Sequence, residues 1–423
     1  MKKTDIMRLV IALAIPLTSF FLPLTSHAQN GTWTLFDTRT SDICGNNISA
    51  LAADGAGIWA GTYQGLCRMK GASWTDYAMF NEKLENQSVN CLMMDDRGVL
   101  WIGTDDYGVI EWDGTSWTEH NEVTRRLKMK FVKEMVFDHD GVLWIGVTLG
   151  GIVTYNGNEW EKYTPDDSGL LSDFILDLAV DQTNRKWITT NSGISIFDGK
   201  RWASFTTANS GLPDNIVPTV AIDSSNVKWF GTLAGLARYD GSTWRVWNTK
   251  NSPLPGNQVN DISIDRDGLL WMATDGGVAV FDGENNWVVF TSKNSALPQG
   301  NIYKSAHDEQ GNHWFGNDSR GLARLSGFTM PAAPAGSNNS IGGKGQGDEQ
   351  VRITPYLDQG FITIAFPSNR ATVKFVNSNG KTVKKVDNYV AGQKIKIDRL
   401  PKGMYTVVIS SSRGDKKIKF NLK

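Results

Sequence analysis

The stretch KWFGTLAGLARYDGSTWRVW, residues 228–247, decides the fold class. It contains short segments rich in aromatic and apolar side chains, which favour β-strands, separated by Leu-Ala and Asp-Gly. Asp and Gly at such turns supply the positive φ that tight hairpins require. With the apolar segment before it, the stretch predicts a unit of four short antiparallel strands, at residues 217–223, 228–232, 235–239 and 243–247.

The tryptophans indicate that this unit recurs seven times. The first series has spacings of 42 or 43 residues and comprises Trp59, Trp101, Trp144, Trp187, Trp229, Trp271 and Trp314. The second has spacings of 41 to 43 residues and comprises Trp33, Trp74, Trp117, Trp160, Trp202, Trp244 and Trp287. Four strands repeated about every 42 residues are typical of a β-propeller blade, and hairpin turns at both ends of the strands disfavour a solenoid.

The phase of the repeat predicts a closed ring. Residues 31–36 match the fourth strand of a unit, whereas the last unit ends at residues 321–327 with a third strand. The N-terminal strand can therefore complete the last blade, which removes the exposed sheet edges. We predict an all-β protein, with a seven-bladed β-propeller over residues 29–328 followed by a small C-terminal β-sandwich.

We expect the periodic tryptophans to form the core between adjacent blades. An aromatic of this size buries ~150–250 Å², which at ~25 cal/mol per Å² contributes roughly 4–6 kcal/mol as an upper bound. The alternative is a set of stacking platforms for sugars or nucleobases. Trp112 and Trp247 lie outside both series. For these two residues, a stacking platform for a ligand is therefore the alternative to a position in the core.

The two ends of the chain differ from the repeats. Residues 1–28 begin with basic residues, continue with an apolar run and end in Ser-His-Ala, which predicts a signal peptide cleaved after Ala28; an uncleaved anchor is the alternative. Residues 329–350 have the composition of a flexible linker. Residues 351–423 predict a β-sandwich of about seven short strands. No later stretch approaches the ~20 apolar residues of a transmembrane helix, so we expect an exported protein in the periplasm, at the cell surface or outside the cell.

Composition excludes two classes of protein, and charge divides the chain. With 40% hydrophobic and 21% charged residues, neither a disordered chain nor a multi-span membrane protein fits. Residues 351–423 contain 15 Lys/Arg and 4 Asp/Glu, a net charge of +11, whereas residues 29–350 have a net charge of −14. This asymmetry favours docking of the tail on the propeller or on an anionic cell surface; a solvated basic sandwich is the alternative.

Cys44, Cys67 and Cys91 all fall in the first two units. In an oxidising compartment an odd number of cysteines leaves at least one unpaired. One local disulfide is compatible with this pattern. The simpler interpretation is that all three are small buried strand residues.

The repeat units resemble a known family. Residues 98–104 (GVLWIGT), 141–146 (GVLWIG) and 228–232 (KWFGT), with the strands that follow them, resemble the two-component regulator propeller repeat. In that family the propellers form the periplasmic sensing region of hybrid histidine kinases, often in gut bacteria that sense glycans. This chain shows no kinase, regulator domain or transmembrane helix, so the resemblance implies a recognition module and not a signalling activity.

The C-terminal residues resemble a second family. Residues 371–381, 400–409 and 419–423 resemble the C-terminal sorting domain of the type IX secretion system. That family usually opens with Pro-Asn-Pro, and Thr354-Pro355-Tyr356 stands in its place. A related Ig-like stalk domain of Bacteroidetes surface proteins is the alternative.

Catalytic and metal-binding motifs do not stand out. After the predicted cleavage four histidines remain, none in a HExxH or paired-ligand spacing: His120, His139, His307 and His313. Residues 138–141 (DHDG) and 265–268 (DRDG) resemble fragments of a calcium loop but lack its bidentate glutamate, and hairpin turns explain them better. We expect no catalytic residue, no metal and no cofactor.

Propeller geometry predicts where a ligand would bind. Loops from the fourth strand to the next first strand, and from the second strand to the third, share one face around the channel. Basic residues in the incoming loop of unit three could hold a polar or acidic glycan beside acidic and aromatic neighbours; solvated, mutually paired charges are the alternative. The predicted ligand-binding residues are Tyr63, Asp105, Asp106, Tyr107, Arg125, Arg126, Asn191, Asp275, Asp318 and Arg320.

Three functions compete. The first is a monomeric, non-enzymatic module that binds a glycan, a peptide or a cell-envelope protein, and no nucleic acid. The second is an enzyme similar to the streptogramin-lyase propellers, for which His120 is the nearest candidate and has no clear partner. The third is a scaffold for surface machinery, anchored by the basic tail. A stoichiometric divalent metal would favour the enzyme.

Overall fold

The computed structural model describes residues 24–28, 31–120, 129–331, 352–356, 361–365, 371–389, 395–397, 400–411 and 414–422. The chain divides into two compact units, Met1–Pro331 and Ala332–Lys423. Most of the predicted signal peptide and linker therefore lies outside the described residues, and their boundaries remain predictions. In the described ranges, no helix has both the length and the apolar character needed to cross a membrane.

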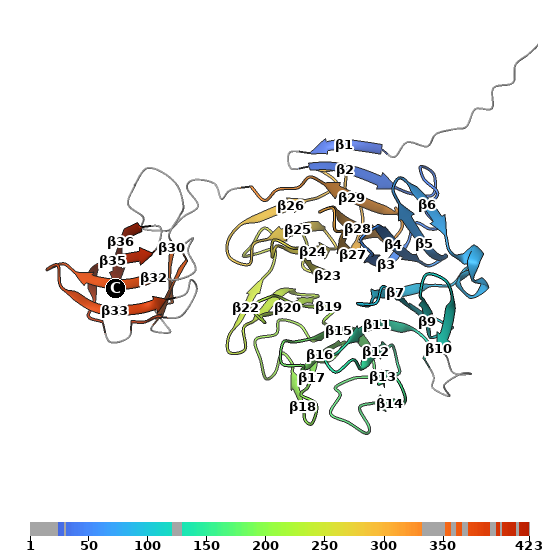
Figure 1. Ribbon diagram of the computed structural model, residues 1–423, viewed down its shortest axis with the longest axis horizontal. Helices are drawn as coiled ribbons and strands as arrows, with labels where there is room; N and C mark the ends of the chain where they lie inside the picture. The colour runs from blue at the N-terminus through green and yellow to red at the C-terminus, as the bar shows by residue number, and fades with distance from the viewer. Residues whose placement is uncertain are drawn as a thin grey trace, which may run out of the picture. The chain divides into compact units, whose positions relative to one another are not determined.

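The first unit is a seven-bladed β-propeller, as predicted, in which each blade is an antiparallel sheet of strands A to D from the centre outward (Figure 1). Blade 1 contains β3 (Ile48–Ala53), β4 (Gly57–Thr62), β5 (Gly65–Lys70) and β6 (Ser73–Asp76). Blade 2 contains β7 (Val89–Met94), β8 (Leu100–Thr104), β9 (Val109–Trp112) and β10 (Trp117–His120). Blade 3 contains β11 (Val132–Phe137), β12 (Leu143–Val147), β13 (Gly151–Tyr155) and β14 (Trp160–Tyr163).

The other blades repeat this order. Blade 4 contains β15 (Ile175–Val180), β16 (Lys186–Thr190), β17 (Gly193–Phe197) and β18 (Trp202–Phe205). Blade 5 contains β19 (Thr219–Ile222), β20 (Lys228–Thr232), β21 (Gly235–Tyr239) and β22 (Trp244–Trp247). Blade 6 contains β23 (Val259–Ile264), β24 (Leu270–Thr274), β25 (Gly277–Phe281) and β26 (Trp287–Phe290). Blade 7 contains β27 (Ile302–His307), β28 (His313–Asn317), β29 (Leu322–Ser326) and, as strand D, β2 (Gly31–Phe36).

The ring closes as the phase of the repeat predicts. Strand β2 pairs antiparallel with β29, with Trp33 opposite Leu325. Strand β1 (Leu24–Ala28) adds a fifth, outermost strand to blade 7 by pairing with β2. Cleavage after Ala28 would remove β1 and leave β2 in place, so closure of the ring does not depend on the predicted signal peptide.

The first-series tryptophans are buried in strand B, and each donates its indole N–H to an aspartate of the preceding A–B turn. The pairs are Trp59–Asp54, Trp101–Asp95, Trp144–Asp138, Trp187–Asp181, Trp229–Asp223, Trp271–Asp265 and Trp314–Asp308, at 2.7–3.1 Å. The same carboxylates accept backbone N–H groups of the turn; Asp138 accepts from Val142 at 3.0 Å. The DHDG and DRDG sequences are therefore hairpin turns whose first aspartate satisfies a buried donor.

A further aromatic series, which we did not recognise from the sequence, explains Trp247. It lies three residues after each second-series tryptophan and comprises Phe36, Tyr77, His120, Tyr163, Phe205, Trp247 and Phe290. Trp247 is only 4% exposed, and its ring stacks on Trp229 at 5.7 Å. Trp112 is half-buried with its ring 4.4 Å from Trp117, in the place that Tyr155 takes beside Trp160. The core interpretation is confirmed for Trp247, and Trp112 packs in the same way as its equivalents.

Cys44 and Cys67 form a disulfide, with 5.8 Å between their Cα atoms. It ties the loop before blade 1 to β5. The interpretation of all three cysteines as unpaired buried residues is therefore wrong for this pair. It is confirmed for Cys91, which is buried and free. Burial raises the pKa of the Cys91 thiol well above its ordinary value, which keeps it protonated and unreactive.

The second unit is a small β-sandwich, as predicted. One sheet contains β30 (Arg352–Tyr356), β31 (Phe361–Ala365) and β34 (Ile395–Lys396). The other contains β33 (Thr382–Tyr389), β32 (Ala371–Asn377), β35 (Gly403–Ser411) and β36 (Gly414–Leu422). Both sheets contribute to one core, formed by Ile364, Val373, Phe375, Ile395, Ile397, Tyr405, Val407 and Ile409.

Candidate functional site

The D–A loops, which join strand D of one blade to strand A of the next, meet the B–C loops at one end of the propeller, as predicted. Backbone hydrogen bonds join neighbouring loops, such as Asn86 N to Gln64 O and Asp105 N to Ser88 O, both at 3.2 Å. We call this end the loop face. The A–B and C–D turns form the opposite end, the turn face.

The predicted ligand-binding residues that the structure describes all lie on the loop face, but five different blades supply them. Blade 1 supplies Tyr63, blade 2 Asp105, Asp106 and Tyr107, blade 4 Asn191, blade 6 Asp275, and blade 7 Asp318 and Arg320. Arg125 and Arg126 lie outside the described residues. Binding by this set remains a prediction.

The loop around Tyr107 is where several of these residues come together. Lys130 Nζ lies 3.2 Å from Asp106 Oδ1, and both side chains are exposed, so the ion pair contributes little to stability. The Asn90 side-chain amide donates to Asp105 Oδ1 at 2.6 Å, and Phe131 N donates to the Asp105 carbonyl at 2.7 Å. Asp105 thus holds its own loop, while Asp106 and Tyr107 project outward.

The loop face also collects apolar side chains that the sequence analysis did not single out. Among the described residues of the propeller, every exposed large hydrophobic side chain lies at this end: Tyr63, Met79, Phe80, Tyr107, Phe131, Leu149, Ile216 and Tyr303. The first seven are in D–A or B–C loops, and Tyr303 is at the start of β27 next to such a loop. Exposed apolar side chains that gather at one end of a protein are typical of an interaction site.

Phe131 and Leu149 have an unusual backbone. Their φ angles are 58° and 57°, in the left-handed region that large side chains rarely adopt. Such a conformation costs on the order of 1–3 kcal/mol, and it persists only where the surroundings impose it. Phe131 is held from both sides, because its N–H bonds Asp105 and its carbonyl accepts from Thr148 N at 3.0 Å. Strain at an exposed apolar residue points to a functional role.

Ionisable side chains bridge the central channel. Lys304 Nζ of blade 7 lies 3.4 Å from Asp261 Oδ1 of blade 6 and 3.5 Å from Glu134 Oε2 of blade 3. Blades 3 and 7 are not neighbours, so the second ion pair crosses the channel. Asp261 is fixed by Ser305, whose N–H and hydroxyl both donate to Oδ2 at 2.8 Å.

These groups shift one another's pKa values. Burial would lower the pKa of Lys304, but Asp261, Glu134 and Asp177 outweigh it and raise that pKa above its ordinary value. Burial and the charge of Glu134 raise the pKa of Asp177 to about 7. Asp177 therefore titrates near neutral pH. Its members occupy equivalent positions in different A strands, 43 residues apart in the case of Glu134 and Asp177, a regularity that could have indicated the channel.

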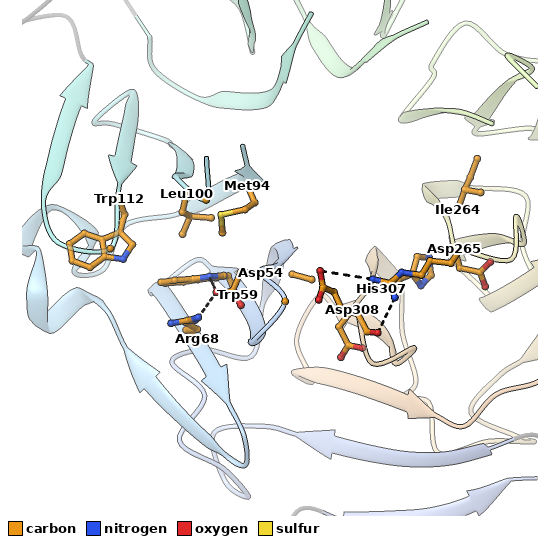
Figure 2. Close-up of a pocket in the computed structure, with 16 residues that line it drawn as sticks. Asp54, Trp59, Arg68, Met94, Leu100, Trp112, Ile264, Asp265, His307 and Asp308 are labelled. Carbon is orange, nitrogen blue, oxygen red and sulfur yellow. Dashed lines mark hydrogen bonds and ion pairs between the residues drawn. The ribbon is translucent and has the colours of Figure 1, made fainter. Parts of the chain in front are cut away.

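A cavity of about 650 Å³ opens on the opposite, turn face (Figure 2). Its apolar side includes Leu100 and Trp112, and its polar side is formed by A–B turns of blades 1, 6 and 7. The carboxylate of Asp54 is already engaged there, because it accepts from the Trp59 indole at 2.7 Å and pairs with Arg68 at 2.5 Å. These carboxylates serve the repeated turn, so we do not place the ligand site in this cavity.

His120, the candidate for a lyase reaction, lies away from the channel mouth. It is buried in β10, the outer strand of blade 2, and stacks on Trp101 at 5.9 Å. Its Nε2 lies 2.5 Å from Glu111 Oε1, so it has a carboxylate partner that the sequence analysis missed. Its position in the aromatic series explains it as part of the core.

The other buried histidines form a pair in blade 7. His307 Nδ1 lies 2.9 Å from His313 Nδ1, and burial lowers the pKa of both to about 4, so both are neutral at pH 7. In the ranges that the structure describes, no three His, Cys, Asp or Glu side chains are grouped so that they could hold a metal.

Two family models match the sequence. Residues 83–106 and 253–276 match the two-component regulator propeller, over the first strands of blades 2 and 6. Residues 357–423 match the secretion system C-terminal sorting domain. The chain thus carries regulator-propeller repeats followed by a sorting domain, and the sorting domain makes it an exported protein of the periplasm, cell surface or exterior.

Solved structures share the fold at low sequence identity. The extracellular domain of the hybrid two-component system BT3049 from B. thetaiotaomicron is 18% identical with a TM-score of 0.62, covering 92% of this chain and 57% of that one. PorZ, a surface component of the type-IX secretion system of Porphyromonas gingivalis, is 16% identical with a TM-score of 0.57, covering 93% and 63%. This chain therefore spans less than two thirds of either.

A propeller enzyme also appears among the similar structures. Virginiamycin B lyase from Staphylococcus aureus is 12% identical with a TM-score of 0.56, covering 69% of this chain and 98% of that one. Among curated proteins, none matches this sequence significantly. At these identities the likenesses establish the propeller fold.

Proposed function

We propose that this protein is an exported, non-enzymatic recognition module that binds a glycan, peptide or protein partner on the loop face. The observation that carries the proposal is the segregation of exposed apolar side chains. Those of the described propeller residues gather at one end, and the turn face has none among them. Because exposed apolar surface is unfavourable in water, a partner that covers part of this face is the simplest reason for it.

The predicted polar residues would supply orientation on the same face. Asp106 and Tyr107 project from blade 2, and Asn191, Asp275, Asp318 and Arg320 are distributed around the ring. Arg125 and Arg126, which follow blade 2 in the sequence, would add positive charge to this set. Well-placed polar groups around an apolar centre are the usual composition of a specific interface.

A surface scaffold is the second candidate. The sorting domain at residues 357–423 supports attachment of the propeller at the cell surface, and PorZ, which has the same fold, is itself a surface component of a secretion system. In that case the loop face would hold another protein of the envelope permanently. The lyase alternative is still supported by the similar fold. Its candidate catalytic residue, His120, lies in an outer strand and therefore does not support it.

Array binding tests the proposal. Mature protein, residues 29–423, is applied to glycan and peptide arrays, and the Kd of the best ligand is measured for wild type and Tyr107→Ala. We expect at least tenfold weaker binding for Tyr107→Ala and no change for Arg266→Ala, an exposed residue of the turn face. Unchanged affinity in Tyr107→Ala together with loss of binding in Arg266→Ala would contradict the assignment of the ligand site to the loop face. A stoichiometric divalent metal in the purified protein would favour an enzyme.

A further inference from the structure

We propose that the exposed apolar side chains on the loop face of blades 1 to 3 dock a polypeptide partner that presents apolar side chains and carries net positive charge. This rests on the proposed recognition function and names the class of partner. The surface, which we call the blade 1–3 patch, consists of Tyr63, Met79, Phe80, Tyr107, Phe131 and Leu149.

Backbone hydrogen bonds link the loops that carry the patch. The loop of residues 77–88 is joined to the B–C loops of blades 1 and 2 by the two backbone bonds described above. Phe131 continues this line, because its N–H bonds the Asp105 carbonyl and its own carbonyl bonds Thr148 N, next to Leu149. The six side chains thus belong to loops that are bonded to one another, whereas Ile216 and Tyr303 belong to other blades.

The kinds of side chain favour a polypeptide over a glycan. Met79 and Leu149 are the most exposed members, at 74% and 69%. Sugar rings stack on flat aromatic faces, whereas flexible aliphatic side chains pack against other apolar side chains. Protein interfaces are enriched in Tyr, Phe and Met, and methionine is frequent at surfaces that accept varied peptides.

The left-handed backbone of Phe131 and Leu149 is a second, independent indication. Glycine adopts such φ angles without strain, and it occupies most of the positive-φ positions of the propeller. Here a phenylalanine and a leucine occupy them, with 47% and 69% of their surface exposed. A side chain that strains its own backbone yet is not buried is explained if it contacts a partner.

Charge defines the rest of the partner. Residues 29–350 carry a net charge of −14, a total that includes the basic residues of segment 121–128. In the described loops of the patch, Lys83 is paired with Glu119 at 2.6 Å and Lys130 with Asp106 at 3.2 Å. An acidic propeller attracts a basic partner over long range and repels an acidic one.

Peptide selection tests this. A phage library of random 12-residue peptides is panned on immobilised mature protein, and the most enriched peptides are synthesised for fluorescence anisotropy. We expect enrichment of large apolar residues together with Lys and Arg, and Kd values that rise with salt. Phe131→Gly and Leu149→Gly should weaken binding at least tenfold while the melting temperature stays equal or increases, because glycine removes the strain.

Asn226→Gly is the matched control, because Asn226 also has positive φ, 62°, but lies in an A–B turn on the turn face. It should leave the Kd unchanged. Enriched peptides that are acidic, or that bind both glycine variants as well as wild type, would overturn the proposal. If a glycan binds wild type and this binding is lost in Phe131→Gly, the ligand class proposed here is wrong, but the loop face remains the recognition site. A ligand that binds only the turn face would contradict both the polypeptide partner and the proposed recognition function of the loop face.

Discussion

The D–A loops after blades 3 to 6 contrast with the loop after blade 1. In the four regular loops the first residue donates its N–H to an Asp or Asn three residues later, at 2.7–2.8 Å. A serine hydroxyl donates back to the carbonyl of the first residue at 2.7 Å. A leucine of each loop is buried: Leu170, Leu212, Leu254 and Leu297.

The loop of residues 77–88 also joins strand D of one blade to strand A of the next, but it has a different structure. It contains two short 3₁₀ helices, Ala78–Phe80 and Glu82–Leu84, and buries Leu84, but it leaves Met79 and Phe80 exposed. The loops after blades 3, 5 and 6 join two blades without exposing such residues, and the loop after blade 4 exposes only Ile216 among them. The difference teaches that stability resides in the repeated parts, and that irregular loops on blades 1 to 3 are free to serve binding.

The largest effect should come from the repeated core. Trp271→Ala is expected to lower the free energy of unfolding by about 4 kcal/mol, because it empties a fully buried site and removes the indole N–H that Asp265 Oδ2 accepts. Urea unfolding measures this, with Tyr107→Ala in the exposed patch as the control expected to cost less than about 1 kcal/mol. Similar losses in the two variants would contradict the division between core and patch.

The loop before blade 1 is irregular too, and a disulfide holds it. Replacing Cys44 and Cys67 together by Ala should lower the free energy of unfolding by about 3 kcal/mol, since the bond closes a separation of 23 residues in the unfolded chain. Wild type unfolded under thiol reductant should match the double variant. Unchanged stability under both conditions would mean that this loop needs no covalent restraint.

A regular loop should be more sensitive than an irregular one to loss of an apolar side chain. Leu254→Ala removes a buried side chain and is expected to cost about 2 kcal/mol. Met79→Ala removes an exposed one and should change stability by about 0.5 kcal/mol or less. Thermal unfolding of both variants makes the comparison, which fails if Met79→Ala is the more damaging change.

The channel cluster should show its effect as a dependence of stability on pH. The pKa of Asp177 is about 7 in the folded protein, above its ordinary value of 3.8, so between about pH 4 and 7 the folded state binds more protons. Stability therefore falls as pH rises through this window. Asp177→Asn should flatten this fall and be more stable than wild type at pH 8, because the neutral amide does not lose a proton there. Asp166→Asn, a substitution of an exposed residue, should have the same dependence of stability on pH as wild type. If Asp177→Asn also has the wild-type dependence, Asp177 is not the cause of the fall.

Prediction from the sequence succeeded where one interaction recurs. The Asp–Trp turn is local, because its partners are five or six positions apart in the sequence, and the same contact recurs in each blade. It failed where partners are distant. Lys304 and Glu134 meet only because the ring closes, and Cys44 finds Cys67 only because its loop folds back over β5. His120 was set apart as a catalytic candidate because its aromatic neighbours in the series went unnoticed.

The regular spacing of the tryptophans in the sequence determined the number of blades. The last blade takes its fourth strand from the start of the repeat region, and this phase determined that the ring closes. Both features depend only on contacts within one unit or between adjacent units. Exposure of Met79, Phe131 and Leu149 could not follow from residue type, since an apolar residue in a loop is buried or exposed according to how its neighbours fold. Only the tertiary structure decided that these side chains lie together at one end of the channel.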